Sequence, residues 1–517
     1  MLAPVSHGDR PIERAAAEVP AAEVPAAEVP EAEVPEAEVP EAKRSAGAGP
    51  AASGRVAAAG GGMLLPLVLT QFVASFAGSA MNVSISSIGK DLGTTVHGVQ
   101  TAITLFLLCM AALMIPGSKL TDILGRKRCL ILGLGVYGTG AVIAALAPVL
   151  GVLIVGYSAF ECVGSALMIP PIYILATIFY PDVQSRARAF GAISGAGGIG
   201  AAAGPLIGGL ITSGISWRVT FLLQAAIVAA VALLSRRLVD PLPADRGRRF
   251  DRLGAALSAA GMFFVVTAIL QIGVNGLLVV ILAALGVGFL GWFLLHIRAL
   301  ERRHLEPLLS TGLLRNRTSN LAMVTQNMQW LLLMGTSFVV SVYLQVVRGY
   351  SAIETGLVFT AATAGVLVSS LAAPRLARRH AQSTLIRAGF VIALAGIGLL
   401  VALVRETSGV WTFVPGLLLM GLGVGAMLTP SVNVVQSSFP DERQGEISGL
   451  SRSISNLGSS LGTAIAGTIL VSASSAGNHA YGYALLAVAV AGVIGLAMAL
   501  LMPRDAGLEP APEEAPA

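Results

Sequence analysis

Charge is scarce in this sequence. Only 12% of its 517 residues are charged, about half the share found in a soluble globular protein, while 55% are hydrophobic and the mean hydropathy is +0.79. The apolar residues come in blocks of about 20, the length at which a helix spans a hydrocarbon core of about 30 Å. Because the blocks are continuous and do not alternate with polar residues, they predict transmembrane helices and not a membrane barrel.

Cysteine and histidine are also scarce, which argues against several kinds of site. Cys109, Cys129 and Cys162 lie in or at the edge of apolar blocks without metal-ligand spacing, and three cysteines are too few for a disulfide framework. The six histidines form no metal pair. A phosphate-binding Gly-Lys-Ser/Thr loop is missing, which argues against an ATP-driven pump. We therefore expect no metal, no cofactor, no enzymatic activity and no nucleic-acid partner.

The N-terminal region, residues 1–60, differs from the rest of the chain. Residues 16–40 are five consecutive pentapeptides that end in Glu-Val-Pro. A proline at every fifth position forbids a helix, and the low hydrophobicity cannot offset the entropy of ordering. We expect a disordered tail, with a docking role for the repeat as the alternative. The C-terminal segment 503–517 is of the same kind.

Fourteen apolar spans are predicted between the tails, at 63–88, 99–118, 129–147, 150–172, 188–213, 217–235, 253–273, 276–297, 319–346, 352–374, 384–403, 410–435, 446–472 and 480–502. Of the 27 Lys and Arg residues within 61–502, 23 then fall on the side of the N-terminus. The opposite side carries Lys90, Arg218, Arg348 and Arg405. By the positive-inside rule, both termini are expected in the cytoplasm of a bacterial cell whose inner membrane holds the protein.

An internal repeat divides the spans into two sets of six. The segment Gly164–Pro171, with Pro181 and Asp182 after it, matches Gly423–Pro430, with Pro440 and Asp441 after it, at a constant shift of 259 residues. The shift leaves the seventh and eighth spans as an insertion. We expect a six-helix bundle at 61–236, two inserted helices at 237–300 and a second six-helix bundle at 301–502. Two parallel halves with a site between them are a design of secondary transporters.

The loop between the second and third spans carries a specific charge pattern. It reads Gly117-Ser-Lys-Leu-Thr-Asp122-Ile-Leu-Gly125-Arg126-Lys-Arg. The two glycines allow a tight turn, and a lone acid among cations at a helix end can form a latch that one conformation closes and another breaks. The alternative is a loop that is merely positive.

The whole pattern resembles the signature loop of the major facilitator superfamily, and fourteen spans resemble its drug:proton antiporter branch. The resemblance covers essentially all of 61–502 and implies an all-α fold of two six-helix bundles plus two inserted helices. It implies that Asp122 and Arg126 help close the cytoplasmic side. Gly200-Ala-Ala-Ala-Gly204-Pro205-Leu-Ile-Gly208-Gly209 in the fifth span resembles the antiporter motif of the family, which favours export. A plain glycine packing stripe is the alternative.

Two departures from the branch affect the expected coupling. The branch usually carries an acid in span one, where this chain has Ala77, and an Arg in span four three residues before a Gln, where it has Ser158 and Glu161. Glu161 lies 11 residues into span four, about 16 Å along the helix. An acid at that depth is costly to charge and suits proton exchange. A permanently neutral Glu161 that holds a neighbouring helix is the alternative.

These patterns predict a monomeric exporter of small lipophilic compounds in exchange for protons, in contact with the lipid bilayer. An importer of the same fold is the alternative, although a hydrophilic solute would require a denser polar set. Several polar side chains in the spans can line a substrate path or form interhelical hydrogen bonds: Asn82, Gln224, Gln326, Gln329 and Asn433.

Overall fold

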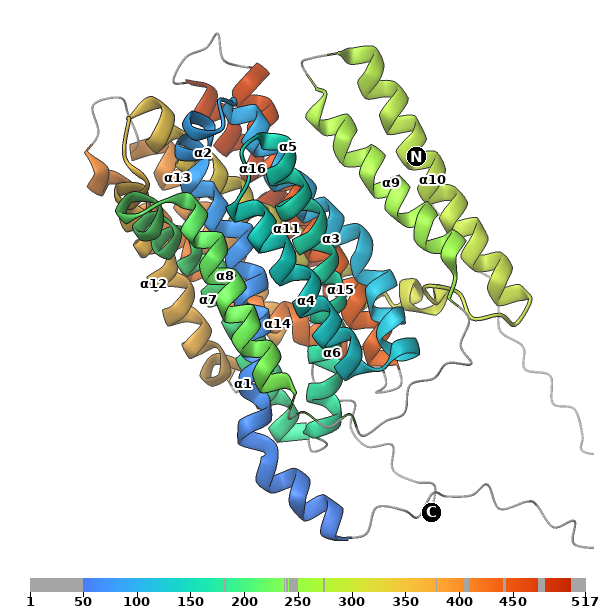
Figure 1. Cartoon of the computed structure of the whole chain (residues 1–517). Coiled ribbons are helices and arrows are strands. Elements are labelled where there is room, and N and C mark those ends of the chain that lie inside the picture. Colours follow the sequence, from blue (N-terminus) through green and yellow to red (C-terminus); the bar gives the residue numbers. More distant parts are fainter. Residues whose placement is uncertain are drawn as a thin grey trace, which may run out of the picture. The chain divides into compact units, whose positions relative to one another are not determined.

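The computed structural model describes residues 50–503, apart from 181–182, 237, 239, 241–249, 273–274, 378, 404–408, 440–442 and 473–478. The expected tails therefore lie outside the described residues, except at their inner ends. The described residues from Gly54 onward belong to one compact unit. Its longer helices are drawn in Figure 1.

The elements of the first half are α1 (Pro50–Ala80), η1 (Met81–Ser84), α2 (Ile85–Asp91), α3 (Val96–Leu124), α4 (Arg126–Ala145), α5 (Leu150–Leu153), η2 (Ile154–Glu161), α6 (Cys162–Phe179), α7 (Val183–Gly214) and α8 (Trp217–Ser235). Helix α1 begins before residue 61, where the first bundle was expected to start. The elements of the hairpin are α9 (Arg252–Leu270) and α10 (Gly276–Arg302).

The elements of the second half are η3 (Thr311–Arg315), α11 (Arg317–Val342), η4 (Tyr343–Val347), α12 (Ala352–Ala377), α13 (Gln382–Leu403), η5 (Val410–Thr412), α14 (Phe413–Ser437), α15 (Gln444–Ser472) and α16 (His479–Leu500). Each half thus contributes six long helical segments. The fold is that of an all-α integral membrane protein with two six-helix bundles.

Thirteen described helices are long and apolar enough to cross a membrane. The remaining predicted span, 446–472, forms α15, which has 29 residues but is rich in serine. Eight of its Ser and Thr side chains are buried inside the protein, namely Ser448, Ser451, Ser453, Ser455, Ser459, Ser460, Thr463 and Thr468. Helix α15 is therefore polar because it lies between other helices, and it completes the fourteen.

The two halves meet along two helix pairs, α3 with α15 and α7 with α12. Helix α9 contacts α3 and α15, and α10 contacts α9 (Figure 1). Only 11% of the most apolar stretch of α10 is buried, against 89% of that of α11. The inserted hairpin thus lies at the edge of the bundle with α10 outermost, where its apolar side chains suit contact with lipid.

A polar cluster joins three segments at one end of the first half. Ser216 caps α8 by accepting a hydrogen bond from the Arg218 amide at 3.2 Å. The Arg218 guanidinium pairs with Asp91 and donates to the Ala147 carbonyl, and the Trp217 indole donates to Asp91 at 3.0 Å. We call this the Trp217 end of the bundle. The opposite end, at the α3–α4 turn, is called the basic end.

Candidate transport site

Glu161 lies at the junction of η2 and α6, where the helix is π-helical over Ile154–Glu161. Its side chain is 0% exposed. Neither carboxyl oxygen makes a hydrogen bond of normal geometry to a described residue, although the Tyr137 hydroxyl lies close enough to interact with it. No described Lys, Arg or His pairs with it. Since an unpaired buried carboxylate is very costly, Glu161 can be accommodated as a neutral acid or when water reaches it.

Polar side chains from α4, α8 and η2 form hydrogen bonds near this acid. The Tyr137 hydroxyl donates to Gln224 Oε1 at 2.5 Å, which links α4 to α8. The Tyr157 hydroxyl donates to the Ala77 carbonyl at 3.2 Å, and Ser158 donates to the Ala102 carbonyl at 2.8 Å. At the two positions where the branch usually carries charged groups, the Ala77 carbonyl and the Ser158 side chain thus each hydrogen-bond to a neutral group. Gln224 belongs to this cluster, as part of the network around Glu161.

Aromatic rings seal the same region. Tyr157 stacks on Phe106 with ring centroids 4.4 Å apart and meets the edge of Phe221 at 5.8 Å. Trp217 contacts Phe221 in turn at 6.0 Å. These four side chains are at most 3% exposed. Such a wall restricts the access of water to the Glu161 region in this conformation.

The glycines of the Gly200–Gly209 segment bring α7 close to two neighbours. A Cβ added at Gly200 would lie 2.5 Å from the Phe72 carbonyl oxygen, and one at Gly208 would lie 3.1 Å from Ala80. A Cβ at Gly204 would overlap the Ser79 side chain. These three glycines face α1, whereas Gly209 faces the Ala352 carbonyl of α12.

Pro205 lies inside α7. A Cβ added at Gly356 of α12 would lie 2.6 Å from the Pro205 carbonyl oxygen. The segment therefore packs α7 simultaneously on α1 in its own half and on α12 in the other half. A packing stripe within one bundle would touch only one of them. The geometry is that of a joint between the halves.

The sequence predicts that two glycines form the tight turn between α3 and α4. The structure shows this role for one of them and a different role for the other. Gly125 has a φ of +93°, a conformation that favours glycine, and it forms the tight turn. Gly117 lies inside α3, where an added Cβ would overlap the Ala166 carbonyl of α6, so its role is helix packing. The Asp122 side chain lies outside the described residues. The latch between Asp122 and Arg126 stays a prediction.

Lys119, in the same motif, forms ion pairs that reach beyond its own half. Its side chain is 5% exposed, and its ammonium lies 3.3 Å from Glu306 and 3.8 Å from Glu446 of α15. Sequence reasoning missed this residue because its partners are 187 residues or more away along the chain. The pairs tie the basic end of the first half to the second half.

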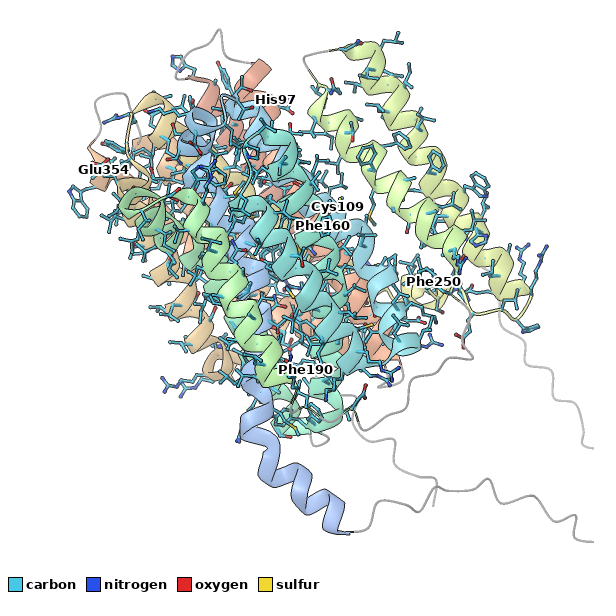
Figure 2. The ribbon with its side chains drawn as sticks, viewed as in Figure 1. His97, Cys109, Phe160, Phe190, Phe250 and Glu354 are labelled. Atoms are coloured by element: carbon cyan, nitrogen blue, oxygen red, sulfur yellow. The ribbon has the colours of Figure 1, made fainter. Side chains whose placement is uncertain are left out.

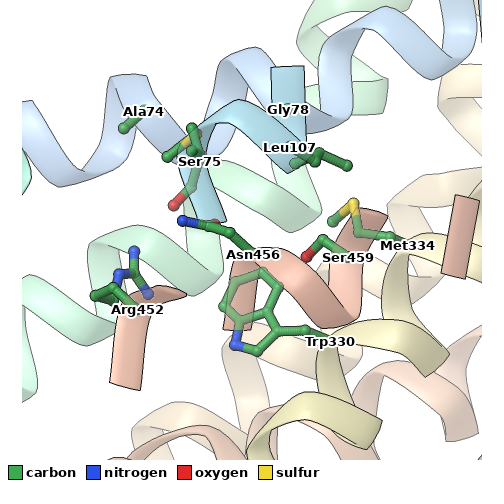
Figure 3. Close-up of a pocket in the computed structure, with 10 residues that line it drawn as sticks. Ala74, Ser75, Gly78, Leu107, Trp330, Met334, Arg452, Asn456 and Ser459 are labelled. Atoms are coloured by element: carbon green, nitrogen blue, oxygen red, sulfur yellow. The ribbon is translucent and has the colours of Figure 1, made fainter. Parts of the chain in front are cut away.

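A central cavity lies between the halves and is nearly closed. It is lined by α1, α3, α11 and α15 through Ala74, Ser75, Gly78, Leu107, Met110, Trp330, Met334, Arg452, Asn456 and Ser459 (Figure 3). Its volume is about 20 Å³, room for about one water molecule. A substrate would enter it only after the halves move apart.

The predicted path residues distribute over different places. Gln326 accepts a hydrogen bond from Ser451 at 2.9 Å, and Gln329 accepts one from Ser431 at 3.1 Å. Asn82 is 0% exposed, and neither its side-chain nitrogen nor its side-chain oxygen has a hydrogen-bond partner among the described residues. None of the three lines the central cavity described above. Gln326 and Gln329 thus form interhelical hydrogen bonds, the alternative expected for these residues, and a role of the five residues in a substrate path stays a prediction.

Asn433 instead lines a larger side cavity of about 650 Å³ between α7, α12 and α14. Small and apolar residues form most of its wall, and Arg188 and Gln382 are its polar members at the basic end. On the same pair of helices, Gly209 touches α12 toward the Trp217 end. Helices α7 and α12 therefore touch toward one end and leave a space at the other, as halves that rock about a joint would do.

The fold and these features define a multi-pass helical membrane transporter with two six-helix halves around a central cavity. The chain belongs to the Major Facilitator Superfamily, whose family model matches residues 67–463 and 322–517. Members of this family are transporters and not enzymes.

Similar proteins place the chain in the drug-efflux branch of the superfamily. It is 31% identical over 422 residues to the puromycin resistance protein pur8 of Streptomyces alboniger, covering 80% of this chain and 82% of that protein. It is 28% identical over 410 residues to the multidrug efflux pump LfrA of Mycolicibacterium smegmatis, covering 78% and 80%. A crystal structure of a peptide transporter POT in complex with sulfate matches with a TM-score of 0.60 at 19% identity, over 86% of this chain and 96% of that one. That likeness concerns the fold alone.

Proposed function

We propose that the protein exports small lipophilic compounds in exchange for protons by alternating access, with Glu161 as the proton carrier. The observation that carries this proposal is a fully buried carboxyl without an ion-pair partner among the described residues. An acid that is neutral when sealed and charged when hydrated binds and releases a proton as the halves move. The names of the similar proteins, which denote resistance and efflux, support the direction of transport.

The basic end faces the cytoplasm of a bacterial cell in this proposal. The excess of Lys and Arg on that side supports the orientation. The Lys119 pairs then close the cytoplasmic side, and the Gly200–Gly209 joint keeps α7 on α12 toward the outer side. Both halves and the cavity belong to one chain, so the protein works as a monomer.

Everted membrane vesicles from an efflux-deficient bacterium test the proposal. With an imposed pH gradient, addition of a lipophilic antibiotic or dye should release protons from vesicles that contain the wild-type protein. Glu161→Gln keeps the shape and removes the titration, and we expect it to abolish substrate-induced proton movement while the protein still reaches the membrane. Cells that express wild type should resist compounds to which cells with the variant are susceptible.

Glu354→Gln is the matched control, because Glu354 is an exposed carboxylate at the end of the bundle, hydrogen-bonded to Ser351 (Figure 2). It should leave proton movement unchanged. Undiminished proton coupling in Glu161→Gln would reject Glu161 as the carrier. Net accumulation of the compounds by intact cells would reject export in favour of import.

A further inference from the structure

The central cavity contains a cation that no described acid neutralises. Arg452, from α15, lines the cavity, and the residues that line it with Arg452 include no Asp or Glu. No described carboxylate forms an ion pair with Arg452. Within the described part of the chain, its buried Nε has no hydrogen-bond partner. A buried N–H donor without an acceptor destabilises a protein, and more so when it carries charge, so a bound acceptor at Arg452 Nε would offset a cost to stability.

Other donors beside Arg452 also lack acceptors. Asn456 Nδ2, one helical turn further along α15, is buried and unpaired and lines the same cavity. Gln326 of α11 receives the Ser451 hydroxyl on its Oε1, which leaves its Nε2 as a buried donor without a partner. Gln326 lies outside the cavity lining, whereas Arg452 and Asn456 present positive charge and an unpaired N–H group to the cavity itself.

An aromatic surface accompanies these donors. The Trp330 ring centroid lies 6.0 Å from the Arg452 guanidinium carbon, and Figure 3 shows both side chains and Asn456 directed into the same space, opposite Ser75 of α1. Leu107, Met110 and Met334 complete an apolar wall. Flat, apolar rings pack well on such surfaces, and thioethers adapt to rings of different shape.

From this geometry we infer that the central cavity binds aromatic organic anions, whose acidic group pairs with Arg452 and whose ring packs on Trp330. The Arg452 guanidinium donates paired N–H groups to a carboxylate or a comparable oxyanion, and Asn456 Nδ2 donates to a neighbouring oxygen. This inference rests on the export function proposed above and specifies its substrate class. The binding form is the one in which the halves have moved apart, because the present volume is too small for a ring.

Two dyes with the same tricyclic xanthene ring and opposite charge provide the test: anionic fluorescein and cationic rhodamine 123. Their binding to purified full-length protein in detergent is measured by fluorescence anisotropy at slightly alkaline pH. This assay needs no proton gradient, so a failure of proton coupling or of export leaves its result intact. We expect wild type to bind fluorescein about tenfold or more tightly than rhodamine 123.

Arg452→Gln should weaken fluorescein binding by about tenfold or more and remove the preference between the dyes. Arg452→Lys, which keeps the charge and loses the paired geometry, should fall between the two. The control Arg379→Gln removes an equal charge from an exposed site at the basic end and should bind as wild type does. Size-exclusion profiles confirm that each variant is folded.

Three results would overturn the inference. They are tighter binding of rhodamine 123 than of fluorescein by wild type, unchanged fluorescein affinity in both Arg452 variants, and no fluorescein binding by folded wild type. If Arg452→Gln does not fold, Arg452→Lys decides, because a loss of affinity for fluorescein alone supports the paired geometry and equal losses for both dyes reject it.

Discussion

Helices α4 and α6 of the first half pack against each other in the same way as α13 and α14 of the second half. A Cβ added at Gly133 would lie 2.7 Å from the Met168 amide nitrogen, and one at Gly389 would lie 2.7 Å from the Gly423 carbonyl oxygen and 3.1 Å from Met427 Cβ. Met168 and Met427 differ by the 259 residues of the repeat. Each half thus joins these helices by backbone contact at glycines.

Further along the same helices, the two halves differ in the residue that lies at equivalent glycine contacts. A Cβ added at Gly140 would lie 2.7 Å from the Glu161 amide nitrogen, and one added at Gly396 would lie 2.5 Å from the Met420 amide nitrogen. Glu161 and Met420 again differ by 259 residues. A shared scaffold thus holds an acid in one half and a thioether in the other, which indicates that the chemistry is added to the packing and not required by it.

The two halves also differ in the spacing of the residues that contact these glycines. In the first half this spacing is one residue longer than in the second. Gly140 touches Gly156 and Glu161, which are five residues apart, whereas Gly396 touches Gly416 and Met420, which are four apart. The additional residue lies within the π-helical turn η2, while α14 is α-helical throughout. A single-turn π-bulge of this kind is frequent at functional sites. Here it positions Tyr157 beside Glu161.

The largest effect should come from the shared glycine contacts. Gly140→Ala and Gly396→Ala each place a methyl group against a backbone nitrogen of the neighbouring helix. We expect each to destabilise the protein by about 1–3 kcal/mol through overpacking, measured as a lower thermal midpoint in detergent. The two losses should be similar, because the packing is the same in both halves.

Gly135→Ala and Gly398→Ala are controls in the same two helices, since an added Cβ at either position meets nothing within 4 Å. They should leave stability unchanged or raise it by up to about 1 kcal/mol, because alanine favours a helix over glycine. A destabilisation by the controls as large as that by Gly140→Ala would show that the close contacts are not the cause.

A smaller effect on stability and a large one on coupling should follow from removal of the π-helical turn. Deletion of Phe160, a half-exposed residue on the outer surface (Figure 2), gives the first half the spacing of the second. We expect the protein to fold, since α14 packs with that spacing. Substrate-induced proton movement in everted vesicles should fall by about tenfold or more, because Tyr157 leaves its place beside Glu161. Unchanged proton movement would mean that the turn has no role in coupling.

Hydropathy and the repeat predicted the spans and the two halves well, because both depend on features local to the sequence. Even α15, the least apolar span, was placed within two residues of its start and at the same end. The position of Glu161 well inside span four indicated a buried acid, and its side chain is buried. Its partners could not be predicted in this way, because Tyr137 and Gln224 lie on α4 and α8 and only the packing of three helices brings them together.

Arg452 shows what the sequence could have revealed. It lies within about two turns of the start of α15, so that the positive-inside count assigns it to the basic end. Yet Arg452, Asn456, Ser459 and Thr463 recur at intervals of four, three and four residues, the spacing of one helix face. A polar stripe with a cation inside a membrane span indicates a cavity. Only the structure shows which helices face that stripe.

The smallest effect should come from the basic loops, where the two halves differ in how far a basic side chain is buried and paired. Lys119 of the first half is nearly buried and paired with Glu306 and Glu446, whereas Arg379, which follows α12 in the second half, is exposed. Lys119→Gln should weaken the closed basic end by about 1 kcal/mol, because Glu306 is 52% exposed and solvent screens such a pair. That energy corresponds to about a fivefold change in the ratio of closed to open molecules.

Spin labels at positions 128 and 375, in a cysteine-free background, report this ratio, since both residues are exposed and lie on opposite halves. The distance distribution of Lys119→Gln should gain a longer component, and more so at low than at high salt, because salt already weakens the wild-type pairs. Arg379→Gln removes an equal charge without an inter-half pair and should leave the distribution as in wild type. Equal shifts in both variants would mean that net charge at the basic end, and not the contacts of Lys119, sets the balance between closed and open forms.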